Sequence, residues 1–201
     1  MEFGQNICVV MCPPSTWLLY RQILIGALAA RTEYIACAED DMLATPEHYL
    51  FRPPTNDTFY YSKGRWWLEK DSFRYRPNRI VMGTCIVNRE LLIGALERRF
   101  AKFPNPPTTR EEQTGWSEPG RYWWYWKLPK EKIAYFHEDT STVIQVNHKC
   151  GLGGMRRSNE SDTYADALPE WGNAMSLYED LFVVQKNVTS EGILTCPSYQ
   201  F

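Results

Sequence analysis

The chain has little net charge and no long apolar run, and its first residues do not match a signal peptide; each of these observations argues against a class of protein. It carries 22 basic and 24 acidic residues, a formal net charge of -2, so no global positive field attracts nucleic acid or an anionic membrane. No apolar run reaches the roughly 18 residues that a membrane span needs. The N-terminus, "MEFGQNICVVMCPPSTW", lacks the basic start and long apolar stretch of a signal peptide. We therefore expect a cytoplasmic protein without membrane insertion.

Paired metal-ligating cysteines are also missing. The six cysteines are scattered and mostly lie inside apolar runs, which favours free buried thiols in a reducing compartment over a disulfide framework. Cys8 and Cys12 have no second Cys/His pair at ligand spacing, so the pattern does not indicate a zinc site.

What the chain does have is an ordinary globular composition with many aromatic residues. Hydrophobic residues make up 44% and aromatic residues 14% of its 201 positions, which is enough for one domain, residues 1–201, with a real core. Apolar runs and capping residues predict a strand at 6–12, a helix at 17–30 capped by Ser15 or Thr16, and a strand at 34–38. A strand-helix-strand unit normally makes its two strands parallel.

The remaining elements complete an α/β pattern: a mixed sheet with a short parallel core, flanked by helices, plus a β-hairpin. The sequence predicts a hairpin at 58–69 that turns near Lys63-Gly64, a buried strand at 80–87 and a helix that Asn88 caps. Residues 104–121 form a long loop rich in Pro, Gly and acids, and loops of that length are lids, binding loops or disordered. Strands at 132–136 and 142–147 and a helix at 169–183 are expected after it.

Three adjacent acids, Glu39, Asp40 and Asp41, directly follow the strand at 34–38. Adjacent carboxylates repel one another unless water, a helix N-terminus or a cation relieves them. Open α/β sheets bind ligands at the carboxyl ends of their strands, and hard divalent cations prefer oxygen ligands. A metal site is one hypothesis; the alternative is that Asp40 or Asp41 only caps the turn at "TPEH".

His148 favours the metal hypothesis because it also follows a predicted strand. The Gly-rich turn "GLGG", which includes Gly153, comes next, and Arg156-Arg157 follow it. Carboxylate plus imidazole suits Mn²⁺ or a similar ion, and arginines hold phosphate oxygens. By itself "GLGG" is weak, since it matches neither a dinucleotide fingerprint nor a P-loop.

The stretch "YRQILIGALAARTEYIACAEDDMLATPEHYLFRPP" resembles the metal-binding core of GT-A fold glycosyltransferases, broadly family-2-like. These enzymes place a D-x-D-type motif after a strand, and "EDD" is similar to it, with Glu39 first and Asp41 last. The segment "VIQVNHKCGLGGMRR" resembles the family's metal-binding histidine segment, and "GWSEPGRY" its acidic acceptor-side loop. The likeness covers roughly residues 5 to 180.

One departure concerns the nucleotide. Such enzymes usually carry two strand-helix units before the acidic motif, and this chain reaches Glu39 after one. The N-terminal nucleotide-binding part is therefore expected to be either a compact variant or incomplete. If it is incomplete, metal and diphosphate binding would survive better than base binding.

The resemblance implies a sugar transfer from a nucleotide-diphosphate donor, such as a UDP-sugar, to an acceptor hydroxyl. Mn²⁺ or Mg²⁺ would be held by Asp41 and His148, with Glu39 or Asp40 assisting. The donor-side residues would be Gly153, Arg156 and Arg157.

The expected general base is Glu118 in "SEPG", with Glu111 and Glu112 as substitutes; the alternative is that all three are solvated loop acids. The acceptor, modified DNA or a glycan, would stack on aromatic side chains, of which we expect Trp116, Trp66 and Tyr122. The alternative for these rings is core or hairpin packing.

Two other functions stay open. A metal-dependent nucleotidyltransferase or phosphodiesterase would use the same acids with Glu138 and Asp139. A non-catalytic glycosyltransferase-like protein would keep the fold and bind without transferring a sugar.

Overall fold

The structure is a computed structural model, and it describes residues 7, 15–75, 80–109, 112, 114–121, 123–136, 142–146 and 162–189. The described helices are α1 (Thr16–Ala29), α2 (Pro46–Leu50), the 3₁₀ turn η1 (Met82–Thr84), α3 (Arg89–Lys102), α5 (Trp123–Trp126) and α6 (Ala174–Thr189). The described strands are β1 (Tyr34–Ala36), β2 (Met42–Ala44), β3 (Thr58–Ser62), β4 (Arg65–Leu68), β5 (Phe73–Tyr75), β6 (Cys85–Asn88), β7 (Lys132–Phe136), β8 (Val143–Val146), β9 (Thr163–Ala165), β10 (Ala167–Leu168) and β11 (Gly172–Asn173).

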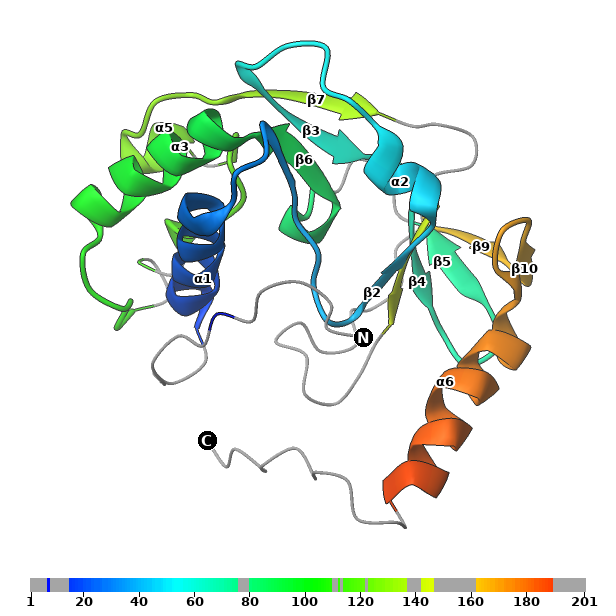
Figure 1. Ribbon diagram of the computed structural model, residues 1–201. Coiled ribbons are helices and arrows are strands. Elements are labelled where there is room, and N and C mark those ends of the chain that lie inside the picture. The colour runs from blue at the N-terminus through cyan, green and yellow to red at the C-terminus, as the bar shows by residue number, and fades with distance from the viewer. Residues whose placement is uncertain are drawn as a thin grey trace.

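Most of these strands form two sheets that lie next to each other (Figure 1). The first sheet has the order β1-β6-β3-β7 and the second has the order β2-β8-β4-β5-β9. The pairs β3·β7 and β4·β8 are parallel, and the other described pairs are antiparallel. The predicted α/β class with mixed sheets is confirmed, whereas the parallel pair expected between the strands at 6–12 and 34–38 is not among the described pairs.

The predicted hairpin at 58–69 is wrong. At Lys63 and Gly64 the chain leaves the first sheet as β3 and enters the second as β4, and the two strands do not pair with each other. Every residue of β3 is buried, because this strand lies inside its sheet and is covered on both faces. Such a strand shows no alternation that would tell a hairpin from a crossing. The hairpin in this region is β4–β5, one strand later.

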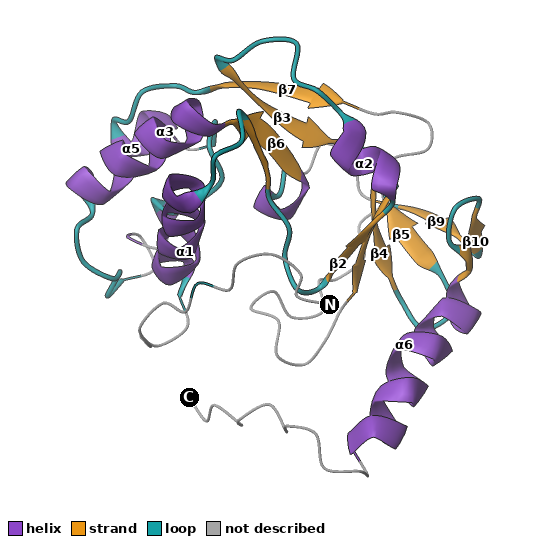
Figure 2. Ribbon diagram, viewed as in Figure 1, coloured by secondary structure: helices purple, strands orange, loops and turns teal. Residues whose placement is uncertain are grey.

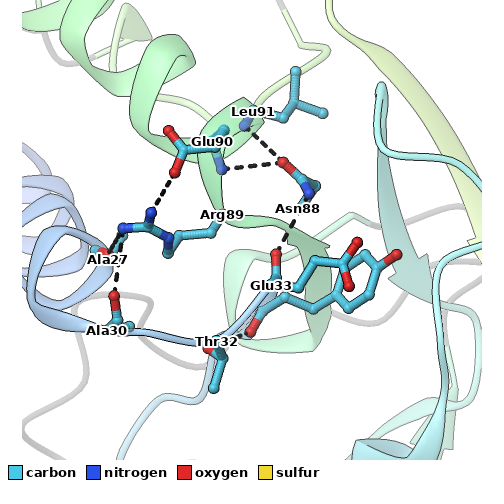
Figure 3. Close-up of polar contacts among 9 residues, drawn as sticks. Ala27, Ala30, Thr32, Glu33, Asn88, Arg89, Glu90 and Leu91 are labelled. Atoms are coloured by element: carbon cyan, nitrogen blue, oxygen red, sulfur yellow. Dashed lines mark hydrogen bonds and ion pairs between the residues drawn. The ribbon is translucent and has the colours of Figure 1, made fainter.

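Helices α1 and α3 lie side by side over one face of the first sheet (Figure 2). The sequence predicted both from their caps. The Ser15 side chain accepts from Leu18 N at 3.1 Å. Asn88 Oδ1 accepts from the amides of Glu90 and Leu91 at 3.0 and 3.2 Å (Figure 3). Their apolar faces form the larger core with Phe59, Tyr61 and other buried residues of the sheet.

The second sheet has a smaller core, which α6 covers with its first turns. The structure corrects the predicted start of one element in each sheet region, α6 here and β6 in the first sheet. The β10–β11 pair occupies residues 167–173, so α6 begins at Ala174 rather than near residue 169. The run 80–87 is a strand only from Cys85, because residues 82–84 form η1.

Cys37 and Cys85 confirm the prediction of free buried thiols for the cysteines that the structure describes. They lie opposite each other where β1 ends, with Cys37 N donating to Cys85 O at 2.9 Å. Burial, and then the nearby Glu39 carboxylate, raises the pKa of Cys37 to about 12, so its thiol stays protonated and unreactive near neutral pH.

Within the described ranges, no helix is both long enough and apolar enough to cross a bilayer.

Candidate functional site

The three acids lie on the short segment that joins β1 of the first sheet to β2 of the second. Its ends are tied to both sheets, through Cys37 N and through Asp41 O, which accepts from Val146 N at 2.7 Å. Asp40 is exposed, whereas Glu39 and Asp41 are partly buried. The parallel partner expected for the strand before the acids, at 6–12, falls outside the described residues apart from Ile7. The described neighbour of β1 is the antiparallel β6.

The Glu39 carboxylate is anchored by η1. Its Oε1 accepts from Gly83 N at 3.0 Å. A glycine is needed here because a Cβ on residue 83 would overlap the Met42 sulfur and lie 3.1 Å from Glu39 Cγ and Oε1. The other Glu39 oxygen, Oε2, is not used in this contact and is the one that can bind something else.

The Asp41 carboxylate is held on one side only. Its Oδ2 accepts from Gln145 Nε2 at 2.9 Å. Its Oδ1 is buried and has no hydrogen-bond partner among the described residues. A buried acceptor without a partner is costly, so this oxygen is the group of the acidic segment most in need of a further donor or cation.

The pKa of Glu39 reflects both its burial and the charges around it. Burial raises the pKa of Glu39 above its usual value, and the charges of Asp41 and Glu118 raise it further. The Gly83 N–H and the Arg65 guanidinium act in the opposite direction and lower it. A bound cation would relieve the same repulsion.

The charge of Glu118, the expected base, acts on Glu39 although 79 residues separate the two in the sequence (118 minus 39). Glu118 Oε2 accepts from Arg121 NH1 at 2.8 Å, and both side chains are partly exposed. The role of Glu118 as a base stays a prediction.

The backbone on either side of Glu118 is fixed from the core. Tyr61 donates its hydroxyl to Pro119 O at 3.1 Å. Arg99 of α3 is 1% exposed and donates to Ser117 O. Hydrogen bonds from the core therefore fix the backbone of the 104–121 loop at Ser117 and Pro119.

A second anchor acts from the other side of the same turn. Glu131 Oε2 accepts from Gly120 N at 3.1 Å, and Glu131 Oε1 pairs with Arg99 at 3.8 Å. Gly120 has a φ of +88°, a conformation that glycine adopts without strain. The buried Arg99–Glu131 pair therefore sets the position of the turn that carries Glu118.

Glu112, an expected substitute base, makes local hydrogen bonds with Thr108 and Thr109. Its Oε2 accepts from Thr108 N at 2.6 Å and Thr109 N at 3.3 Å, and Glu112 N donates to Thr109 Oγ1 at 3.2 Å. This is the reciprocal pattern of a capping box. The hydrogen bonds from Thr108 and Thr109 lower the pKa of Glu112, which makes it a weaker base.

Trp116, an expected acceptor-side residue, is buried in the larger core. It is 1% exposed and packs against the rings of Phe100 and Tyr20, with centroid distances of 4.6 and 5.9 Å. Its ring completes the core between α1 and α3, so it is not exposed to stack on an acceptor. The loop composition around it gave no sign of this.

Trp66 is half-buried on β4, and its ring lies 5.2 Å from the Tyr75 ring and against the core of the second sheet. It acts there as a packing residue. Trp124 of α5 is 61% exposed. It is more exposed than Trp123, the other α5 side chain that the structure describes.

The other expected site residues lie outside the described residues. They are Glu111, Tyr122, His148, Gly153, Arg156 and Arg157, and with them Glu138 and Asp139. Among the described residues, no three His, Cys, Asp or Glu side chains are grouped so as to hold a metal ion.

The sequence reasoning missed two residues of this region. Gln145 is a lone amide in the apolar strand "VIQV", and Gly83 interrupts the apolar run "IVMGTCIV". A glycine or a polar residue inside such a run is a recognisable signal, because it marks a close backbone approach or a buried polar contact. Neither signal names its partner.

Comparisons with models of protein families, with curated proteins and with solved structures found no match to this chain.

Proposed function

We propose that this chain is a cation-dependent glycosyltransferase with a GT-A-like fold, which transfers a sugar from a nucleotide-diphosphate donor to an acceptor hydroxyl. The observation that carries the proposal is the junction between the two sheets. There, the buried and unpartnered Asp41 Oδ1 lies on the same short segment as Glu39, whose pKa is raised by burial and by the charge of Asp41. An acidic motif after a strand, next to an anchored acidic loop, is the arrangement that the sequence resemblance implies.

The residues of the junction fit a divalent cation in part. Asp41 would offer Oδ1 and Glu39 would offer Oε2, which are the oxygen ligands that Mn²⁺ or Mg²⁺ accepts. We propose His148 as a further ligand and Arg156 and Arg157 as donor-side charges. When bound, the cation supplies Lewis-acid stabilisation for the departing diphosphate.

In this proposal Glu118 is the general base and takes the proton of the acceptor hydroxyl. Arg121 holds one of its oxygens, so the other is available to the acceptor. The anchors at Ser117, Pro119 and Gly120 keep the backbone of Glu118 in place, and such positioning is a large part of what a base contributes.

The proposal is tested by calorimetric titration of UDP with and without Mn²⁺. We expect metal-dependent UDP binding in the wild type and a loss of at least about tenfold in the Asp41→Asn variant, since a removed carboxylate ligand weakens a divalent site. Asp57→Asn is the matched control: it neutralises an exposed carboxylate that pairs with Lys132, outside the junction. This control should bind like the wild type.

The outcomes separate the possible functions. If Mn²⁺ binds but UDP does not, the titration is repeated with GDP, CDP and ADP to find another nucleotide. If the folded wild type binds neither the metal nor any nucleotide, the proposal is wrong. Where binding is found, analysis of the products distinguishes sugar transfer from nucleotidyl transfer.

A further inference from the structure

Gln145 connects the acidic segment to the second sheet. It lies on β8, and its Nε2 donates to Asp41 Oδ2 at 2.9 Å. On the other side its Oε1 accepts from Trp67 Nε1 at 2.8 Å and from Arg65 NH1. One amide therefore joins an acid of the β1–β2 segment to two residues of β4.

The orientation of this amide is determined by its neighbours. The Arg65 guanidinium and the Trp67 indole are donors only, so they must face the amide oxygen. The amide nitrogen is then left to face Asp41, whose ionised carboxylate can only accept. A flipped amide would place N–H against N–H on one side and oxygen against oxygen on the other.

The two donors are themselves fixed. Arg65 and Trp67 are each 6% exposed, and the Arg65 guanidinium carbon lies 4.2 Å from the centre of the Trp67 ring. This stacked pair leaves the Gln145 oxygen little freedom to move, and the position of the nitrogen follows from it.

We propose that Gln145 is a positioning residue that presents Asp41 Oδ1, and that oxygen alone, to the cation. The inference rests on the proposed function. The Gln145 side-chain N–H donates to Asp41 Oδ2, and the Val146 backbone N–H donates to Asp41 O and so holds the main chain of Asp41. Oδ1 is the oxygen that remains, and it is the one that would hold the ion. Partners behind a ligand commonly change metal affinity by about 10–100-fold.

The test is Mn²⁺ binding followed by electron paramagnetic resonance, with the metal alone as the probe. We expect Gln145→Met to bind Mn²⁺ about 10–100-fold more weakly. At saturating metal we expect the spectrum of the bound ion to change, because a released Asp41 carboxylate rotates and alters the coordination. Trp171→Phe is the control, since Trp171 Nε1 donates to Thr142 O at 3.3 Å, just before β8, and does not reach Asp41.

Thermal melts first establish that each variant is folded, and Gln145→Leu replaces Gln145→Met if the latter is not. Binding within about twofold of the wild type with an unchanged spectrum would overturn the role of Gln145 and leave the proposed function standing. Equal weakening in Trp171→Phe would overturn it as well, because a general loosening of β8 would then explain the effect. A wild type that binds no Mn²⁺ overturns the proposed function and this inference together.

Discussion

At the scale of single residues, Gly83 shows how closely the acidic segment is packed. Its N–H holds Glu39, and an added Cβ would collide with the Met42 sulfur and press on the Glu39 side chain. Both neighbours are flexible, so they can shift, and Gly83→Ala should lower the free energy of unfolding by about 1 kcal/mol, at the low end for overpacking. Because Glu39 must move, the variant should also bind Mn²⁺ more weakly.

The control for this prediction is Gly26→Ala. Gly26 lies inside α1, and a Cβ there would meet nothing within 4 Å. Removing a glycine from a helix interior should stabilise the protein by about 0.5–1 kcal/mol. Chemical denaturation of the two variants therefore checks for changes of opposite sign, and a Gly83→Ala variant at least as stable as the wild type would contradict the packing described for Gly83.

At the scale of the element, the junction between β6 and α3 depends on Asn88 (Figure 3). Its Oδ1 caps α3, and its Nδ2 donates to Glu33 O at 3.4 Å. Arg89, the next residue, reaches the carbonyls of Ala27 and Ala30 at the end of α1, where a cation is favourable. One turn therefore links β6 and α3 to the segment that leads into β1.

Asn88→Ala should lower the free energy of unfolding by about 1–2 kcal/mol, because the first amides of α3 lose their acceptor in a buried setting. Asn88→Ser keeps a capping oxygen and loses the bond to Glu33, so its loss should be clearly smaller. Urea unfolding followed by circular dichroism measures both. Equal losses would show that the bond to Glu33, rather than the cap, carries the stability.

At the scale of the whole molecule, two sheets meet where the chain crosses between them, and α2 lies beside this meeting point (Figure 1). His48 of α2 is 1% exposed, next to the Phe136 ring at 5.5 Å, and neither imidazole nitrogen has a hydrogen-bond partner among the described residues. Burial lowers the pKa of His48 from 6.5 to about 4. The imidazole is thus neutral in the folded protein near neutral pH.

This shift predicts how stability changes with pH. Between pH 6.5 and about 4 the unfolded chain binds a proton at His48 that the folded protein does not, so stability falls as the pH falls through this window. The full loss is about 3 kcal/mol and is complete below the folded pKa. Leucine does not titrate. As the pH is lowered from 7 to 4.5, the melting temperature of His48→Leu should therefore fall less than that of the wild type. Parallel pH profiles would contradict a buried neutral His48.

The sequence by itself determined the features that depend on near neighbours. Ser15 and Asn88 mark the starts of α1 and α3, because a cap acts on amides two or three residues away. The acidic motif after a strand was readable for the same reason, as was the α/β class, which follows from the order of short apolar runs. Glu112 was readable in principle as well, since its capping partners, Thr108 and Thr109, lie within four residues.

Only the tertiary structure decided what depends on distant residues. It placed β3 and β4 in different sheets and buried Trp116 between α1 and α3. The contact between Gln145 and Asp41 spans 104 residues, and no local pattern encodes its partner. The physical reason is that hydrophobic burial is non-directional. An apolar run shows that a segment is buried, but which surfaces meet is settled by the packing of the whole chain.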